Sequence, residues 1–114
     1  MKIESYRFGS IKIDGKVYMR DVIIFPDKVL SPWWRKMGHN LSISDLNEVI
    51  EYNPDLLIIG TGAYGVMRVP DSTLESLRER DIKVKVLKTG EAVKNYNESV
   101  EKGVNVVACL HLTC

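Results

Sequence analysis

Three features of this 114-residue sequence predict a single α/β domain, residues 1–114, with a mixed sheet of about five strands. An Asp14-Gly15 turn separates two strand-like segments near the start of the chain. A continuous apolar run, Leu56-Leu57-Ile58-Ile59, ends in glycine. From residue 56 to residue 110, strand-like and helix-like segments alternate, which is the pattern of right-handed crossovers over parallel strands.

The N-terminal part predicts a β-hairpin followed by a connector. Residues 11–13 and 16–19 flank Asp14-Gly15, a dipeptide that supplies the positive φ angles of a two-residue hairpin turn. We expect the second strand to continue through residues 22–25 and to stop before Pro26, which cannot donate to a sheet. Residues 26–40 hold two prolines, two adjacent tryptophans and no sustained period, so they are predicted to be irregular.

The middle of the chain predicts two helices around a buried strand. Residues 42–52 are expected to form a helix, because Ser42 and Asp45 have the spacing of an N-terminal cap. Residues 56–60 form a strand that is apolar on both faces, which indicates a central place in the sheet. A second helix is expected to open at Ser72, which has capping-box spacing with Glu75.

The last part predicts an edge strand, a helix and a second buried strand. Lysines alternate with apolar residues over residues 82–87, which is typical of a sheet edge with one wet face. Thr89 is expected to cap a third helix that ends at Gly103. Burial then places strand 56–60 between 82–87 and 104–110, with the hairpin beyond 104–110, which gives the predicted strand order 2-1-5-3-4.

The predicted order contains a switch point at which a ligand could bind. Open α/β sheets bind ligands beyond the carboxyl ends of the strands where the chain reverses its direction of progress across the sheet. Here that point is flanked by Gly60, Thr61 and Gly62 after one strand, and by His111 and Thr113 after the other.

The turn after strand 56–60 matches a dinucleotide-binding pattern only in its spacing. Gly60-Thr61-Gly62-Ala63-Tyr64-Gly65 reads as G-x-G-x-x-G, but the next helix signal is at Ser72 and the following strand ends in Leu87-Lys88-Thr89 instead of an acid. We therefore predict a structural turn and no cofactor. The alternative is that amides of this turn hold a small anion or polar metabolite, with Arg68 as counter-charge.

Charge and cysteine content exclude several classes of function. Sixteen basic and fifteen acidic residues give a net charge of +1, so we expect neither nucleic acid nor a membrane as partner. No run approaches the roughly 20 apolar residues of a membrane helix, and a cytoplasmic location is expected. Cys109 and Cys114, with His111 beside them, offer too few ligands for structural zinc. We predict free thiols, no metal site and no catalytic residue.

The connector carries the most unusual surface candidate, Trp33-Trp34-Arg35. Tryptophan and arginine are enriched where proteins bind one another. The segment therefore predicts a partner-binding patch, for another protein or for a second copy of this chain. The alternative is that one or both rings cover the sheet beneath a long connector.

Several short motifs together resemble a known family of small domains. They are Trp34-Arg35 with Gly38-His39, Leu57-Ile58-Ile59-Gly60-Thr61-Gly62, Val69-Pro70 with Ser72-Thr73, Ala92-Val93 with Tyr96-Asn97, and the segment 104–114. The chain resembles the family that includes the adipogenesis-associated domain-containing protein and NADH dehydrogenase (complex I) assembly factor three, and it looks most like a stand-alone archaeal member of the methanogen type.

The resemblance implies a three-layer α/β fold with a mixed sheet, but it supplies no reaction, substrate or cofactor. Our leading prediction is a non-enzymatic binding or assembly module that recognises a protein through Trp33, Trp34 and Arg35. The alternative is a small-molecule-binding domain or minor enzyme, with its site formed by Gly60, Thr61, Gly62, Arg68, His111 and Thr113.

Overall fold

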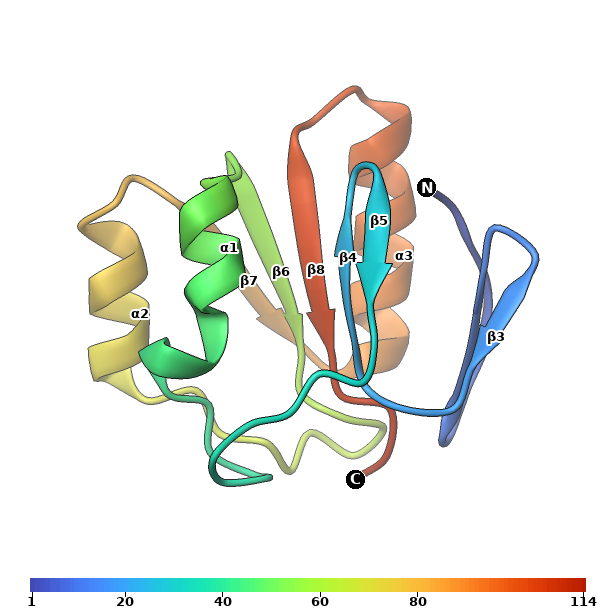
Figure 1. The fold of residues 1–114 in the computed structure, drawn as a ribbon, viewed down its shortest axis with the longest axis horizontal. Coiled ribbons are helices and arrows are strands. Elements are labelled where there is room, and N and C mark those ends of the chain that lie inside the picture. Colours follow the sequence, from blue (N-terminus) through green and yellow to red (C-terminus); the bar gives the residue numbers. More distant parts are fainter.

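The computed structural model describes residues 1–114 and contains two sheets and three α-helices (Figure 1). None of the helices is long and apolar enough to cross a membrane. The elements are, in chain order, β1 (Ile3–Arg7), β2 (Ser10–Ile13), β3 (Lys16–Tyr18), β4 (Val22–Phe25), β5 (Lys28–Leu30), the 3-10 helix η1 (Ile43–Leu46), α1 (Asn47–Tyr52), β6 (Leu56–Gly60), α2 (Asp71–Arg78), β7 (Lys83–Leu87), α3 (Thr89–Glu101) and β8 (Val106–Leu110).

The main sheet has the strand order β5-β4-β8-β6-β7. β6 runs parallel to both β7 and β8, whereas β4 runs antiparallel to β8 and to β5. The predicted α/β class and mixed five-stranded sheet are confirmed, and so are the central place of β6 and the edge place of β7. Every residue of β6 and β8 is buried, as expected for strands covered on both faces.

The predicted place of the hairpin is wrong. β2 and β3 form the expected hairpin, with positive φ at both Asp14 and Gly15, but they belong to a separate three-stranded sheet, β1-β2-β3. The strand beside β8 is β4, which was predicted to be the end of the second hairpin strand. That long strand is broken because the chain leaves the small sheet after Tyr18 and enters the large one at Val22.

The connector also contains a strand that its sequence did not indicate. β5 pairs with β4 across a tight turn, and together they form the antiparallel edge of the main sheet. β4 is buried at all four positions, and its apolar side chains fill both faces of the sheet. The rest of residues 31–42 is irregular, as predicted.

Helix starts differ in detail from those predicted. Ser42 and Asp45 do form a capping box, in front of η1 and not of one continuous helix. Asp71 is the first residue of α2 after Pro70, and Ser72 makes no capping bond. Likewise Thr89 is the first residue of α3 and does not cap it. Proline before the first helical turn explains the earlier start of α2, because its fixed φ suits the approach to a helix.

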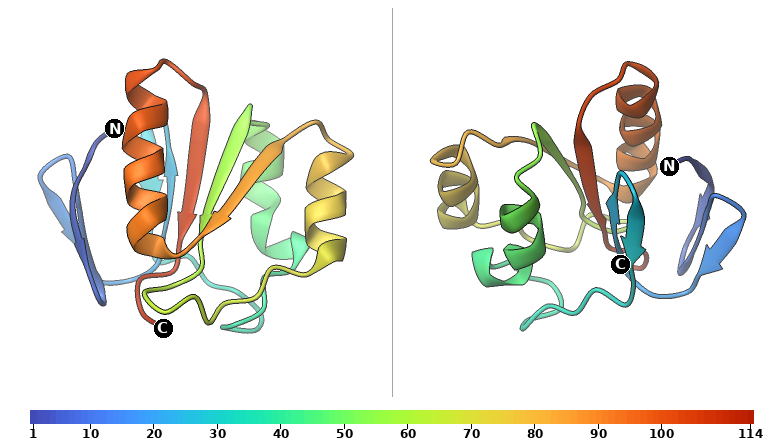
Figure 2. Two further views of the ribbon diagram at one scale, coloured as in Figure 1. Left: turned by 180° about the vertical axis from the view of Figure 1, so that it is seen from behind. Right: turned by 45° about the horizontal axis from the view of Figure 1, so that its top comes forward.

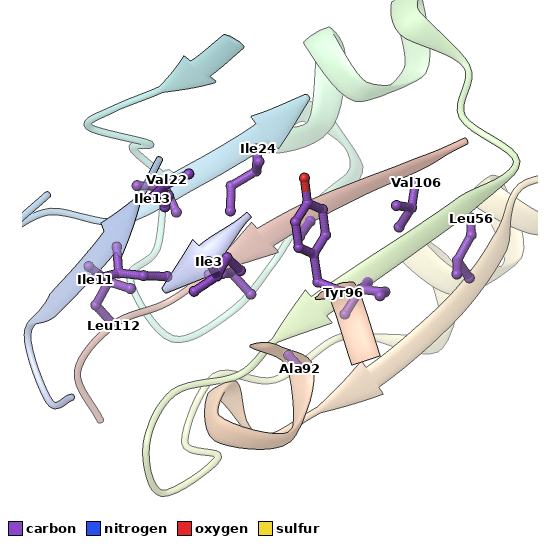
Figure 3. Packing of buried hydrophobic residues seen from close by; sticks show 13 residues of the cluster. Ile3, Ile11, Ile13, Val22, Ile24, Leu56, Ala92, Tyr96, Val106 and Leu112 are labelled. Atoms are coloured by element: carbon purple, nitrogen blue, oxygen red, sulfur yellow. The ribbon is translucent and has the colours of Figure 1, made fainter. Parts of the chain in front are cut away.

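Layers on both faces of the main sheet enclose two apolar clusters (Figures 1 and 2). One face is covered by α1 and α2, and the other by α3 with the small sheet beside it. Alternation along β8 sends Ala108 and Leu110 to the α3 side and Cys109 to the other side. Figure 3 shows Tyr96 of α3 among isoleucines of the small sheet and residues of β6 and β8.

The small sheet is fastened to α3 by a side chain. Asn97 accepts from the backbone N–H of Ile3 at 3.0 Å and donates to its carbonyl at 2.8 Å. Both bonds are of ordinary length, so one amide satisfies both backbone groups of a β1 residue. The hairpin therefore covers the α3-side cluster and does not extend the main sheet.

Candidate functional site

Several loops gather at the end of the main sheet where β6, β7 and β8 terminate (Figure 1). They are the β1–β2 turn, the β3–β4 link, the connector after β5, the loop after β6, and residues 111–114. Gly9 of the first turn donates to the carbonyl of Leu112 at 2.8 Å, which fixes that turn beside the end of β8. We call the outer face of these loops the carboxyl-end surface.

The backbone amides of the turn after β6 are already hydrogen-bonded within this chain. Ala63 donates to the carbonyl of Thr113 at 2.6 Å, and Tyr64 and Val66 donate to the oxygen of Cys114 at 3.2 and 3.1 Å. Thr61, Gly65 and Met67 also donate to backbone carbonyls. With Gly62 bonded to a side chain, every amide from Thr61 to Met67 has an acceptor within the chain.

Gly62 is required where the turn after β6 meets residues 113 and 114. Its φ is +109°, and a Cβ added there would lie 2.2 Å from the carbonyl carbon of Cys114. No real side chain fits at that distance, so the close approach of residues 113 and 114 depends on glycine. The turn therefore has a structural role, in which it packs against residues 113 and 114. A structural turn is what its sequence context predicted.

Thr89, at the start of α3, joins the ends of both central strands. Its buried hydroxyl accepts from the N–H of Gly62 at 2.9 Å and donates to the carbonyl of His111 at 2.6 Å. A Cβ on Gly60 would lie 2.9 Å from the same oxygen, so this glycine also makes room for Thr89. Thr89 was predicted only as a helix cap, and its role here was missed.

A buried network of charged side chains lies beside this joint. Oδ2 of Asp21 accepts from Nδ1 of His111 at 2.8 Å and from a terminal nitrogen of Arg35 at 2.8 Å. Its other oxygen accepts from the N–H of Leu112 at 2.8 Å. The side chains of Arg35 and His111 are only 5% and 7% exposed, so the ion pair is largely removed from water. It binds the connector to the start of β4 and to the end of β8.

These bonds determine the charge of Asp21 and the tautomer of His111. Burial by itself would raise the pKa of Asp21, but the hydrogen bonds from His111, Leu112 and Arg35 outweigh it and hold this pKa below its usual value. Because the carboxylate only accepts, the hydrogen of His111 must be on Nδ1. The Arg35 nitrogen 3.1 Å from Nδ1 is therefore a close neighbour of the ring and does not donate to it.

Two buried nitrogens of the network have no hydrogen-bond partner within the chain. They are Nε2 of His111 and the second terminal nitrogen of Arg35. The network borders a cavity of about 240 Å³ that is also lined by Trp33, Trp34 and Thr113. A buried polar atom without a partner is uncommon and marks a place where a small polar group could be accommodated.

The predicted partner-binding residues are placed very differently from one another. Trp33 is 3% exposed, donates from Nε1 to the carbonyl of Asp45 at 3.0 Å, and lies under the guanidinium of Arg35. Trp34 is 70% exposed, with the guanidinium of Arg20 over its ring at 5.7 Å. Trp33 and Arg35 thus anchor the connector, and only Trp34 presents its ring to solvent.

Arg68 lies apart from the other predicted ligand-binding residues. Its side chain is exposed, and its backbone pairs with the connector through His39 and Leu41. By contrast Gly60, Thr61, Gly62, His111 and Thr113 do lie together, at the joint around Thr89. The structure therefore brings five of the six residues into one place.

Comparison with known proteins assigns the chain to a family. A model described as "Protein of unknown function (DUF498/DUF598)" matches residues 3–111, nearly the whole chain. The chain belongs to this family. Its fold is shared with the conserved hypothetical protein PH1505 from Pyrococcus horikoshii OT3, which is 30% identical, with a TM-score of 0.83 and full coverage of both chains.

Two further solved structures share the fold of this chain. The protein MT938 is 31% identical, with a TM-score of 0.83, and the match covers 99% of this chain and 98% of that one. A Bordetella pertussis protein described as an Mth938-like domain is 18% identical, with a TM-score of 0.78 and coverage of 97% and 85%. The predicted resemblance to an uncharacterised family is thereby confirmed at the level of the family and its fold.

Asp21 was absent from the predicted site, and no local signal in the sequence marks it. It follows Arg20 in a short link between strands of two different sheets, and its partners lie 14 and 90 positions away. Fifteen acidic residues of the sequence could neutralise Arg35, and no sequence pattern distinguishes Asp21 among them. Only the topology selects Asp21.

Proposed function

We propose that this chain is a non-enzymatic binding module that recognises a protein partner through the carboxyl-end surface, with Trp34 at the centre of the contact. The observation that carries the proposal is the exposure of Trp34 on a connector anchored by buried neighbours. A large aromatic ring held rigidly in solvent loses little entropy on binding and contributes strongly to affinity.

Other exposed apolar side chains on loops at the same end of the sheet support this proposal. Six of the ten large hydrophobic side chains that are exposed lie on the loops at this end of the sheet. They are Phe8, Met19, Trp34, Met37, Tyr64 and Val66. Phe8 and Tyr64 contact one another, with ring centroids 6.1 Å apart. Concentration of exposed apolar groups at one end of a small domain is typical of a protein-binding surface.

The charges on the same loops suggest the chemistry of the partner. Arg20, Lys36, Arg68 and Lys88 are all exposed there. The acidic residues on or beside these loops are Asp21, which is already paired, Asp71 in the first turn of α2 and Glu91 in the first turn of α3. A partner with an apolar centre and an acidic rim would match this surface.

Site-specific photo-crosslinking in the native host tests the proposal. A photoreactive phenylalanine analogue at position 34 should give one discrete adduct with another protein, identified by mass spectrometry. The matched control is the same analogue at Val104, which is 37% exposed at the opposite end of β8 and should give no such adduct. Equal adducts at both positions would contradict the proposal, and an adduct with a second copy of this chain would identify a homodimer.

A binding measurement with the identified partner completes the test. Trp34→Ala should weaken the complex by at least about tenfold, because aromatic hot-spot residues commonly contribute more than 1 kcal/mol. Met37→Ala, at the border of the surface, should have a smaller effect. The thermal unfolding midpoint should stay close to that of the wild type in both variants, since both side chains are mostly exposed.

A second candidate function is favoured by the two unpaired nitrogens of Arg35 and His111. A small oxyacid that accepts from this nitrogen of Arg35 and donates its own hydroxyl to Nε2 of His111 would fit the predicted small-ligand role, with Thr113 beside it. The cavity lined by Arg35, His111 and Trp34 supports this candidate better than the Gly60-Thr61-Gly62 turn does, because the amides of Thr61 and Gly62 are already bonded within the chain. Inorganic phosphate, which both accepts and donates, should then raise the melting temperature of the wild type but not of Arg35→Gln, and no change in either protein would reject this candidate.

The resemblance to a stand-alone archaeal member of the family, and a cytoplasmic location, belong to this proposal as well. Both agree with a binding module that acts on another soluble protein. Neither specifies which partner is bound.

A further inference from the structure

A cavity lies along the free edge of the main sheet. It is a groove of about 770 Å³ between β7 and α2. Figure 2, left, shows β7 as the outermost strand beside α2. Its apolar lining includes Leu56, Leu74, Val84 and Val86. Lys83 and Lys85 also line it and are basic.

The backbone of β7 has hydrogen-bonding groups that face outward along this groove. Lys83 donates to Asp55 and Leu87 accepts from Thr61, so the odd-numbered residues of β7 direct their backbone groups toward β6. In a strand these directions alternate. The N–H and C=O groups of Val84 and Val86 therefore point away from the sheet, where no further strand pairs with β7.

The two faces of β7 differ in chemistry. Val84 packs against the cluster beneath α2, and Val86, on the same face, is 42% exposed. On the opposite face Lys83 and Lys85 are exposed, and Lys85 reaches Asn95 of α3 at 3.3 Å. A strand added at this edge would meet apolar side chains on the α2 side and positive charge on the α3 side.

Charge opposes a second copy of this chain at the edge. In an antiparallel pair of two β7 strands joined through Val84 and Val86, the lysines of one strand would face those of the other, either Lys85 opposite Lys85 or Lys83 opposite Lys85. Like charges directly opposite each other destabilise a strand pair. Asp81 also lines the groove but precedes β7, and Arg78 is paired with Glu75 at 2.6 Å, so the charges on the strand itself are those of Lys83 and Lys85.

We infer that the β7 edge binds an extended acidic segment of another protein as an added strand. Residues of this segment alternate between apolar side chains, which lie against Val84, Val86 and Leu74, and acidic side chains, which face Lys83 and Lys85. Backbone bonds to Val84 and Val86 hold the segment, and the alternation determines its register. This site is separate from the carboxyl-end surface, so it stands or falls independently of the proposed function.

The experiment uses the full chain and two synthetic peptides of equal length, one alternating valine with glutamate and one alternating valine with lysine. The glutamate peptide should bind, and the lysine peptide should bind at least about tenfold more weakly. Amide hydrogen exchange should slow at Val84 and Val86 when the glutamate peptide is added. Raising the salt concentration should weaken binding, because exposed charges are screened.

Two variants make the test specific. Lys85→Glu should lower the affinity for the glutamate peptide about tenfold and raise that for the lysine peptide. The control Lys102→Glu makes the same change in charge at the end of α3 and should leave both affinities unchanged. Trp34→Ala should also leave them unchanged, which separates this site from the one proposed above.

Three results would overturn the inference. Equal affinity for the two peptides would show that charge does not select the occupant. Slower exchange confined to residues outside β7 would show that the peptide binds elsewhere. Protection of Val84 and Val86 that grows with protein concentration in the absence of peptide would show that the edge is covered by a second copy.

Discussion

His111 donates from Nδ1 to Oδ2 of Asp21 at 2.8 Å, although the two residues are 90 positions apart. The bond links the end of β8 to the residue that precedes β4, and Arg35 adds the connector to the same carboxylate. Three segments that carry the exposed loops are therefore joined by one buried side chain. The network therefore links the loops of the carboxyl-end surface to one another.

Removing the carboxylate should destabilise the fold at neutral pH. In Asp21→Asn the buried guanidinium of Arg35 loses its counter-charge, which should lower the free energy of unfolding by about 3 kcal/mol. Urea denaturation measures this change. The control is Asp27→Asn, which removes an exposed carboxylate at the β4–β5 turn and should change the free energy of unfolding by less than about 0.5 kcal/mol.

The same variant should alter the acid sensitivity of the protein. The pKa of Asp21 in the folded state lies below its ordinary value of 3.8, so the unfolded chain binds a proton at a higher pH than the folded one. The stability from Asp21 is fully present above the ordinary pKa and is lost as the pH falls through the lower folded-state pKa. The difference between wild type and Asp21→Asn should shrink below about pH 4, and a constant difference would contradict the assignment.

Gly62→Ala should release residues 113 and 114 from the turn after β6. The added Cβ would overlap the backbone of Cys114 at a positive φ, and we expect a loss of more than about 3 kcal/mol. Gly103→Ala is the matched control, because its φ is +76° but no atom lies near the added Cβ, so it should cost only about 1–2 kcal/mol. Faster hydrogen exchange at Ala63, Tyr64 and Val66 would confirm the displacement. Equal losses in the two variants would show that the contact is unimportant.

The two cysteines should differ sharply in reactivity. Cys109 is fully buried in β8, and this burial raises the pKa of its thiol far above the usual range, whereas Cys114 is partly exposed. At about pH 8, iodoacetamide should modify one thiol in the native protein, and mass spectrometry should place it at Cys114. Cys114→Ser should then resist modification until the protein is unfolded. Native labelling of that variant would contradict the burial of Cys109.

The fold was predictable where the signals are local. β6 and β8 are continuous apolar runs, β7 alternates lysine with apolar residues, and Asp14-Gly15 fixes a hairpin. Each of these features follows from a few neighbouring residues. The break between β3 and β4 was not predictable in this way, because it depends on the contacts of Asp21 with residues distant in the sequence.

The candidate site was predictable only in part, for the same reason. Gly62, His111 and Thr113 were found because they follow strand ends, and strand ends determine where the loops of an α/β sheet lie. Whether Trp33 or Trp34 faces solvent depends on the partner that the indole nitrogen finds, here the carbonyl of Asp45. Nothing in the sequence Trp33-Trp34 shows which of the two rings is buried.

Thr89 provides the sharpest test of how the two central strands are held together. Thr89→Val preserves the shape of the side chain but removes the hydroxyl, so the N–H of Gly62 and the carbonyl of His111 both lose a buried partner. Each unpaired group costs about 1–3 kcal/mol, and we expect a loss of about 3 kcal/mol in urea denaturation. Thr73→Val is the control, because the buried hydroxyl of Thr73 bonds only the carbonyl of Leu41, and the loss should be about half as large. If both variants lose the same stability, the hydroxyl of Thr89 acts on one strand end only, and the joint between β6 and β8 must depend on the backbone contacts of Gly62 with Cys114 instead.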